Sequence, residues 1–462
     1  MQDAKVALKN LVTQAKETYH KWEIRHLWPA RILEYFLLSL LVSLVGAIFF
    51  KYFNLFQTNV DSARYMLSAL VQTQAAIVAI VVTLTLIAVQ LTAQAYSPRV
   101  IRIFRDNPDM WILLLFYVVS ILYGLLVLKM IQTGNLRQIT LFGSYLEYHL
   151  FSAYIAVAFT FFMLFPYMWN IINLLNPATI INRLAAEITK DSLLKSEEDP
   201  IQPIMDIVHG SIMKYDIATT RDGLRAVTDR VIELIDSDND EKISKLFCDH
   251  LKRVCRLAIR RDDEESAIEV IKNLEIFGKS TAEKKLSEAT RLAVTSLGMI
   301  GEAAAEKGFE VAAIQAAISL EKVGVASAEK ILKDATKISV EFLFLIGCIT
   351  VEKDFEDATG HVVVSLGTIG IRVAKNDLED AVKRAAVSLL TIGIQATKKK
   401  FEVVRGEVAD YLAQLTILRE NVVKTVIRNI QSILTEEQRD PFSKIMDLYK
   451  PELQKLRAEQ QQ

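Results

Sequence analysis

The stretch MLSALVQTQAAIVAIVVTLTLIAVQLTAQAYSPR, from Met66 to Arg99, decides how the rest of the chain is organised. No charged side chain occurs between Met66 and Leu91. This uncharged run exceeds the roughly 20 residues that a helix needs to cross a hydrocarbon core. We therefore predict a membrane-spanning helix, and one that carries several amides and hydroxyls along its length.

The polar residues of this helix fall into two stripes. At about 100° per residue, one narrow sector holds six small or polar residues, the first polar stripe: Gln72, Ala76, Ala79, Thr83, Gln90 and Gln94. The opposite side holds the second polar stripe: Gln74, Thr85 and Thr92. Polar side chains need partners in a lipid environment, so we expect each stripe to face protein or water.

Two interpretations of the first polar stripe are open. Small and polar residues allow membrane helices to approach closely and to form hydrogen bonds across the contact. Alternatively, Gln72, Thr83 and Gln90 border a water-filled path at the centre of an oligomer, where uncharged polar groups let ions pass without binding them tightly. These residues are therefore predicted to line either a pore or a helix contact.

The end of the same stretch resembles a known family. The motif T-L-x-A-x-Q-L is formed by Thr85 to Leu91, and a few residues later follow Ser97, Pro98 and Arg99. It is similar to the signature of a bacterial and archaeal family of predicted membrane proteins that is classed as a domain of unknown function. The resemblance covers mainly the first 175 residues. It implies a multi-pass membrane protein with a cytosolic C-terminal part, and it implies no activity.

Four apolar segments are long enough to span a membrane, and together they predict a transmembrane domain over residues 32–175. They cover about 32–50, 66–92, 111–131 and 148–172. Lys and Arg are concentrated before the first span and between the second and the third, and such enrichment marks cytoplasmic loops. We therefore expect a cell-membrane protein with both termini in the cytoplasm. No charged residue lies in the middle of a span, which argues against an ion-coupled transporter.

Two flanking regions differ from the spans in composition. Residues 1–31 contain a basic amphipathic helix, predicted to be cytosolic, which either lies along an anionic membrane face or packs as a soluble helix. Residues 176–250 form a polar junction and helical linker that contains Pro177, Pro200 and Pro203.

An internal repeat of 23 residues follows. Its leucine column is Leu251, Leu274, Leu297, Leu320, Leu343, Leu366, Leu389 and Leu412. Six glycines keep the same step four positions later: Gly278, Gly301, Gly324, Gly347, Gly370 and Gly393. Two further columns stay in phase, one running from Phe309 to Phe401 and one from Ala289 to Ala381. Such a repeat is typical of a solenoid.

Each repeat has the length of one helix and a short charged turn. Successive helices must then run antiparallel, so that two repeats form a hairpin close in length to the repeats of HEAT and armadillo arrays, which this region resembles. We predict that the glycines admit the backbone of a neighbouring helix. The fold class is thus all-α, with a four-helix transmembrane domain, a cytosolic solenoid of single-helix repeats over 251–430, and a capping helix and tail over 431–462.

Composition and motifs exclude several function classes. Lys plus Arg number 54 and Asp plus Glu 55, a balance that gives no case for nucleic-acid binding. No glycine-rich phosphate loop, H-E-x-x-H or G-x-S-x-G motif is present, so we expect neither an enzyme nor a cofactor. Cys248, His250 and Cys255 have poor zinc spacing, and no metal site is predicted.

Two functions remain. The first is a homo-oligomeric ion channel or solute pore in the lipid bilayer, which the cytosolic solenoid regulates. The alternative is a membrane-anchored interaction scaffold or sensor, whose solenoid binds a cytosolic protein or a small-molecule effector. The symmetry of the solubilised particle would separate them, because a closed ring favours the channel.

Overall fold

A computed structural model describes residues 27–52, 59–95, 101–105, 107–131, 140–141, 144–195, 199–237 and 240–460. The chain forms two compact units, Met1–Ala186 and Glu187–Gln462. The division falls inside the predicted junction of residues 176–250. Most of the predicted N-terminal helix and the whole Ser97-Pro98-Arg99 motif lie outside the described residues.

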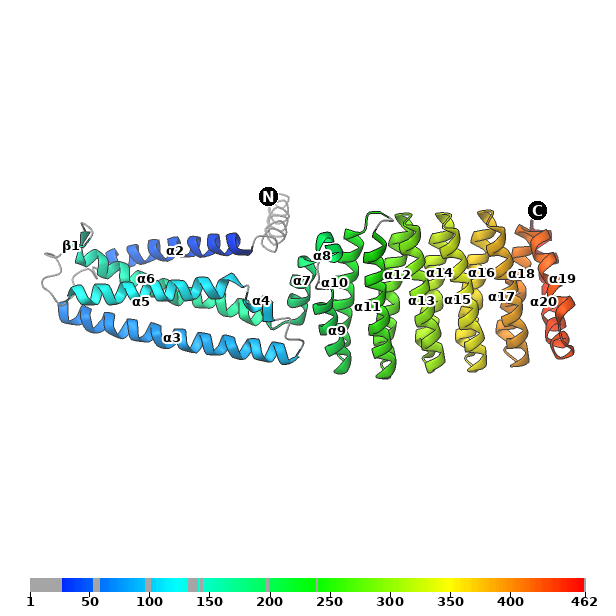
Figure 1. Ribbon diagram of the computed structural model, residues 1–462, viewed down its shortest axis with the longest axis horizontal. Helices are drawn as coiled ribbons and strands as arrows, with labels where there is room; N and C mark the ends of the chain where they lie inside the picture. The colour runs from blue at the N-terminus through cyan, green and yellow to red at the C-terminus, as the bar shows by residue number, and fades with distance from the viewer. Residues whose placement is uncertain are drawn as a thin grey trace. The chain divides into compact units, whose positions relative to one another are not determined.

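The first unit is a bundle of long helices (Figure 1). Its elements are α2 (Leu27–Tyr52), α3 (Val60–Ala95), α4 (Ile101–Arg105), α5 (Pro108–Ile131), β1 (Thr140–Leu141), β2 (Ser144–Tyr145), α6 (Leu146–Leu174) and α7 (Pro177–Glu187). The two short strands pair antiparallel directly before α6. The predicted all-α class is confirmed apart from this small ribbon.

Among the residues that the structure describes, four helices are long and apolar enough to cross a membrane. Three of them, in α3, α5 and α6, cover the predicted spans 66–92, 111–131 and 148–172. The described apolar part of α2, Ile32–Gly46, is shorter. The fourth is α14 (Glu310–Glu329) of the second unit, whose mean hydropathy of 1.3 is the lowest of the four and whose apolar window is more than half buried. It is packed among other helices, so we assign it to the solenoid core.

Helix α3 packs into the bundle along one seam. Its buried residues recur at alternating intervals of four and three: Leu67, Val71, Gln74, Val81, Thr85, Ala88 and Thr92. Val78, which is half-buried, fills the one gap in this series. Intervals of three and four residues keep one face of a helix against its neighbours, as in coiled coils. Leu67 and Val71, at the N-terminal end of this seam, form a core with Val127 and Ile131 of α5 and Leu150 of α6.

The second unit is an array of helices side by side (Figure 1). Its elements are α8 (Lys190–Lys195), α9 (Gln202–Met213), α10 (Ile217–Leu234), α11 (Glu241–Arg260), α12 (Glu264–Glu283), α13 (Ser287–Lys307), α14, α15 (Lys333–Glu352), α16 (Glu356–Lys375), α17 (Glu379–Lys398), α18 (Glu402–Leu418), α19 (Glu420–Ile433) and α20 (Glu436–Gln460). The predicted solenoid is confirmed.

The array has two layers. Helices α10, α12, α14, α16 and α18 pack in sequence in one layer, and α9, α11, α13, α15 and α17 pack in the other. Each helix also contacts the next one along the chain, so consecutive helices form hairpins that span the two layers. Stacking begins at α9 and α10, ahead of the repeat start predicted at residue 251, and α20 closes the far end against α17 and α18.

Each turn between repeats places one residue in the left-handed backbone region. These residues are 23 positions apart: Asp262, Lys285, Gly308, Ile331, Asp354, Asp377 and Lys400. From Lys285 onward, the residue after each belongs to the apolar column that runs from Phe309 to Phe401, extended backwards by Leu286, whereas Asp262 is followed by Asp263. The amide of this next residue reaches back into the preceding helix, as from Phe355 N to Thr350 O at 2.9 Å. This is the Schellman motif, which ends a helix by satisfying its last carbonyls.

The glycine column receives side chains, not the predicted backbone. A Cβ atom built on Gly347 would lie 2.5 Å from Ile392 Cδ1, and one on Gly324 would lie 2.6 Å from Ile369 Cδ1. In each case the incoming side chain immediately precedes the glycine two repeats further on. The column therefore sets the spacing between neighbouring helices of one layer.

Candidate functional site: two polar faces of one membrane helix

The second polar stripe lies inside the bundle. Gln74, only 2% exposed, donates from Nε2 to Ser120 Oγ on α5 at 2.9 Å and to Thr160 Oγ1 on α6 at 2.7 Å. One amide thus connects three helices near the middle of their spans. Hydrogen bonds of this kind hold helices together in lipid.

Two threonines continue this stripe along α3. Thr85 donates to Val81 O at 2.7 Å and its hydroxyl also shares a hydrogen bond with the Tyr167 hydroxyl of α6. Thr92 donates to Ala88 O at 2.8 Å and is 3% exposed. All three residues of the second stripe are buried and hydrogen-bonded, Gln74 and Thr85 to neighbouring helices and Thr92 to its own helix.

The first polar stripe lies on the outside of the single chain. All six of its residues, from Gln72 to Gln94, are exposed. Thr83 donates to Ala79 O at 2.8 Å, whereas Gln72 makes only a long 3.5 Å contact with Ser68 Oγ. Within the described part of the chain, no hydrogen bond reaches the side chain of Gln90 or Gln94. Unsatisfied amides in hydrocarbon cost several kcal/mol each by order of magnitude.

A buried polar cluster that the sequence reasoning missed joins α5, α6 and α7. Asn170 of α6 donates to Asn107 Oδ1 at 3.4 Å and to Asp109 Oδ2, and Arg183 of α7 donates to Asn170 Oδ1 at 3.2 Å. Asp109 is 1% exposed and Asn107 is 2% exposed. The local signal was the sequence Asn107-Pro108-Asp109, in which the asparagine caps α5 by accepting from Asp109 N at 3.2 Å.

These contacts share one face of α6. Thr160, Tyr167 and Asn170 are spaced by seven and three residues, which keeps them on one side of a helix. Together they bind Gln74, Thr85 and Asp109 in turn. The bundle interior thus contains a line of polar contacts, whereas the first polar stripe forms no hydrogen bond with any other helix that the structure describes.

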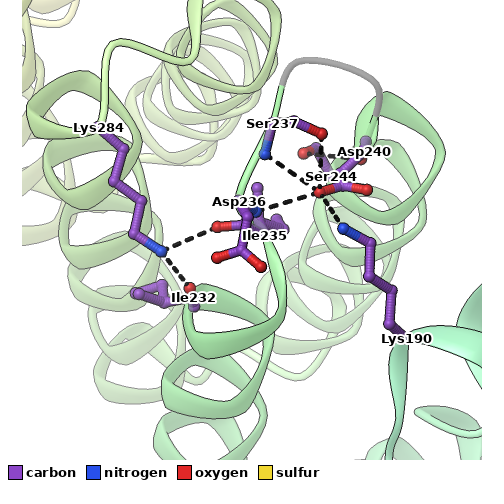
Figure 2. A network of polar contacts seen from close by, with 8 residues as sticks. All are labelled: Lys190, Ile232, Ile235, Asp236, Ser237, Asp240, Ser244 and Lys284. Atoms are coloured by element: carbon purple, nitrogen blue, oxygen red, sulfur yellow. Dashed lines mark hydrogen bonds and ion pairs between the residues drawn. The ribbon is translucent and has the colours of Figure 1, made fainter.

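A second polar network fixes the start of the solenoid (Figure 2). Asp240, 3% exposed, accepts Lys190 Nζ of α8 at 2.7 Å and the backbone amide of Asp236 at 3.1 Å. Burial raises the pKa of this carboxyl, but the hydrogen bonds from Lys190 and from the amides of Asp236 and Ser237 outweigh burial and hold the pKa below its usual range. The charged carboxylate therefore stabilises the folded loop.

Two further cations fasten the same region. Lys284, at the end of α12, donates to Ile232 O at 2.7 Å and to Ile235 O at 2.8 Å, where α10 ends (Figure 2). Arg230 donates to Ile188 O at 2.9 Å, and Ile188 is fully buried. Residues 188–195, which directly follow α7 in the chain, are thus fixed to the first solenoid helices. We call this set of contacts the junction clamp.

The cysteine and histidine side chains near residue 250 have structural partners. Burial raises the pKa of Cys248 and of Cys255 to about 12, so both remain thiols at neutral pH. His250 Nε2 lies 2.5 Å from Asp199 Oδ2. Asp199 Oδ1 accepts from Ile201 N at 2.9 Å at the start of α9. This pair fixes the beginning of α9 against α11.

Residues 26–239 match the family described as predicted membrane protein (DUF2254). The match spans the membrane bundle, the junction and the first solenoid hairpin. It confirms the resemblance inferred from Thr85 to Leu91 and the later S-P-R motif. No curated protein and no solved structure matches the chain.

Proposed function

We propose that the protein is a homo-oligomeric membrane pore in which the α3 helices of several copies surround a common axis. The observation that supports this proposal most is the outward exposure of the first polar stripe on a helix whose opposite stripe is buried and already forms hydrogen bonds within its own bundle. Within the described residues the first stripe has no partner on another helix, which supports partners in other molecules or in water.

Copies of the same chain are the partners that suit this stripe best. Subunits related by rotation about the membrane normal present the same residue at the same depth, and closed symmetry is the rule for soluble homo-oligomers. Gln90 of one copy then lies level with Gln90 of the next, and an amide both donates and accepts. Ala76 and Ala79 leave room for close approach of the helices.

The composition of the stripe favours passage of ions or small solutes over tight binding. It contains amides, a hydroxyl and methyl groups but no charge. A path lined in this way hydrates a solute without holding it strongly, which conduction requires. With both termini in the cytoplasm, the solenoid lies on the cytoplasmic side, and the junction clamp is the point at which it influences the span that precedes it in sequence.

The test compares two leucine variants of neighbouring threonines. Thr83→Leu adds an apolar constriction to the first stripe and is expected to slow K⁺, Cl⁻ or small-osmolyte flux through purified full-length protein in liposomes. A barrier raised by about 1.4 kcal/mol would lower the flux about tenfold. Thr85→Leu, in the buried stripe, removes the contact with Tyr167 and is expected to lower thermal stability instead.

Flux measured with the wild-type protein in liposomes tests the pore independently of the variants. Absence of protein-dependent flux for all three solutes, in a particle that electron microscopy shows to be monomeric, would rule out the pore.

A membrane-anchored scaffold is the second candidate, and one observation favours it. A groove of about 790 Å³ lies between α19 and α20, over the buried side chains of Phe442 and Met446. Arg428, Arg439 and Lys450 line it and form no ion pair with other described residues. Such a surface suits an acidic amphipathic segment of a cytosolic protein. If the protein is a scaffold, reversal of these charges abolishes partner binding, and neither the wild type nor the variant shows protein-dependent flux.

A further inference from the structure

A partly open cavity of about 420 Å³ lies between α2, α5 and α6 of the membrane bundle, and two residues of its wall, Phe116 and Val119, are 37% and 54% exposed. Six hydroxyl-bearing residues contribute to its wall: Ser39, Ser43, Ser120, Tyr123, Ser152 and Thr160. Apolar rings complete it, among them Phe116 and Phe159, which pack edge to face with centroids 5.2 Å apart. The volume lies in the range of small-molecule sites.

The cavity exists because α2 presents small residues to the bundle. Ser39, Ser43 and Gly46 follow one another at intervals of four and three residues, on one face of the helix. At Gly46 the helices are so close that an added Cβ atom would lie 2.2 Å from Ile155 Cδ1 of α6. One and two turns earlier, the serine side chains are too short to fill the space opposite α5 and α6.

The polar groups of the cavity wall act mainly as acceptors. Ser39 and Ser152 donate their hydroxyl protons to carbonyls of their own helices, at 3.0 and 2.9 Å. Thr160 likewise donates to Val157 O at 2.8 Å. Each hydroxyl has one proton and two acceptor sites, so these oxygens keep acceptor sites for a donor inside the cavity, although Thr160 Oγ1 already uses one of its two to accept from Gln74.

An unsatisfied acceptor lies behind the cavity floor. Gln74 donates its amide protons to the wall residues Ser120 and Thr160. Its carbonyl oxygen Oε1 is buried and accepts no hydrogen bond from any described residue. A buried acceptor without a donor costs free energy, and most such groups in native proteins are satisfied by water or a ligand.

The cavity wall contains no charged side chain. A charged molecule would lose its hydration on entering and gain no counter-charge, which is prohibitive in a low-dielectric interior. The occupant is therefore uncharged, soluble in the membrane, and a hydrogen-bond donor. The rings of Phe116 and Phe159 suit its apolar part.

We propose that this cavity binds an uncharged, membrane-soluble alcohol or phenol. Its hydroxyl group donates to the acceptors around Ser120, Thr160 and Gln74, and its ring or chain packs against Phe116 and Phe159. The residues that line the site all belong to one chain and none of them is in α3, so the site does not depend on the pore proposed above. Occupancy would fix α2 to α5 and α6 at the face where small residues leave space.

The proposal is tested with a diazirine-bearing aliphatic alcohol as a photoreactive probe. Full-length protein in lipid nanodiscs is irradiated with the probe, and labelled residues are mapped by peptide mass spectrometry. We expect labelling of the wall of α5 and α6, including Phe116 and Phe159, with competition by unlabelled octanol. The methyl ether of the probe, which cannot donate, is expected to label this site about three- to tenfold less, the loss of one hydrogen bond.

Matched substitutions separate the cavity from the lipid-facing surface. Ser43→Leu and Ala156→Leu each fill the cavity and should abolish labelling. Val118→Leu enlarges a lipid-facing residue of α5 that is 50% exposed, and it should change nothing. Variants are compared only when their thermal transition and elution volume match the wild type. Equal labelling by alcohol and ether, or full labelling of either well-folded filled variant, would overturn the proposal.

Discussion

Single residues in the solenoid turns carry a backbone cost that the fold accepts repeatedly. Of the seven left-handed turn residues that recur every 23 positions, only Gly308 is a glycine. An L-residue in this region costs roughly 1 to 2 kcal/mol relative to the right-handed helix. Ile331 is the most strained type, because its branched Cβ is crowded at φ 63°. This conformation lets the amide of the next residue form the hydrogen bond that ends the helix. It also directs the apolar side chain of that next residue inward at positions such as Phe401.

Ile331→Gly is therefore expected to stabilise the protein. The isoleucine side chain is 61% exposed, so little burial is lost, while the backbone strain is relieved. We expect a gain of up to about 1 kcal/mol, seen as a higher thermal transition of the solenoid. Gly308→Ala, at φ 96° with no atom within 4 Å of the new Cβ, should lower the transition for the same backbone reason. A lower transition for Ile331→Gly would show that the turn is not strained.

For single residues, the sequence predicts the positions that recur in every repeat but does not predict contacts between residues that each occur once. The leucine, glycine and phenylalanine columns were visible because they recur in phase. Asp109, Asn170 and Arg183 gave no such signal, because they are 61 and 13 positions apart and each occurs once. Their association depends on how α5, α6 and α7 pack, which no local pattern encodes.

Among the helices, α3 has two polar faces, of which one is buried in the bundle and the other is exposed. The pattern of Gln74, Thr85 and Thr92 predicted a face that needs partners, and the structure provides those partners within the same chain. The equally polar face that includes Gln72 and Gln90 is left without them. Periodicity alone could not distinguish the two faces, because both repeat at helical spacing and only the positions of α5 and α6 decide which is covered.

The glycine column of the solenoid predicts a difference between two leucine substitutions. Gly347→Leu inserts a side chain where Ile392 and Val362 already lie within 3.0 Å of the new Cβ, and overpacking should destabilise the solenoid by about 1 to 3 kcal/mol. Gly406→Leu, in α18, meets nothing within 4 Å and should be neutral or stabilising. Thermal unfolding measures both, and equal effects would contradict the assigned packing.

The junction clamp predicts a pH-dependent contribution from one carboxylate. The pKa of Asp240 is lowered in the folded state, so its ionised form favours folding at neutral pH, and this contribution is lost as pH falls below the usual aspartate value of 3.8 toward the folded value. Asp240→Asn should cost about 1 to 2 kcal/mol at pH 7 and progressively less below about pH 4. Stability is measured by thermal unfolding across this range.

Asp236→Asn serves as the matched control for the clamp, because it changes an exposed carboxyl of the same loop while keeping the backbone amide that Asp240 accepts. It should leave stability within experimental error at every pH. A cost for Asp240→Asn that stays constant down to pH 3 would mean that the charge contributes nothing.

For the whole molecule, the distribution of Lys and Arg predicts the orientation in the membrane. Reporter fusions after Gln57 and Gln138 should be extracytoplasmic, and fusions after Asn107 and Gln462 should be cytoplasmic. Gln57, Asn107 and Gln138 lie between successive apolar segments and Gln462 lies after the last one, so a change of side between two reporters shows that the segment between them crosses the membrane. A cytoplasmic reporter at Gln138 would contradict the four-span topology and place the solenoid on a different side.

The broad division of the molecule could be predicted from hydropathy and repeat spacing, but its boundaries could not. The repeat pattern becomes regular near Leu251, whereas α9 and α10 already stack on the array with degenerate sequences. End helices of a solenoid have only one neighbour in their layer, so their packing constrains fewer residues. The junction was expected to be a linker, yet Lys190 and Arg230 bind it to the array.

The two-layer arrangement imposes a rule of parity on this chain. One sequence repeat is one helix, whereas the geometric unit is two, because successive helices belong to opposite layers. Excision of a single 23-residue block would transfer every later helix to the other layer. The side chains that these helices now expose on one face of the array would then lie on the opposite face. Excision of two blocks would only shorten the array. Lineages of this protein are therefore expected to differ in solenoid length by even numbers of helices.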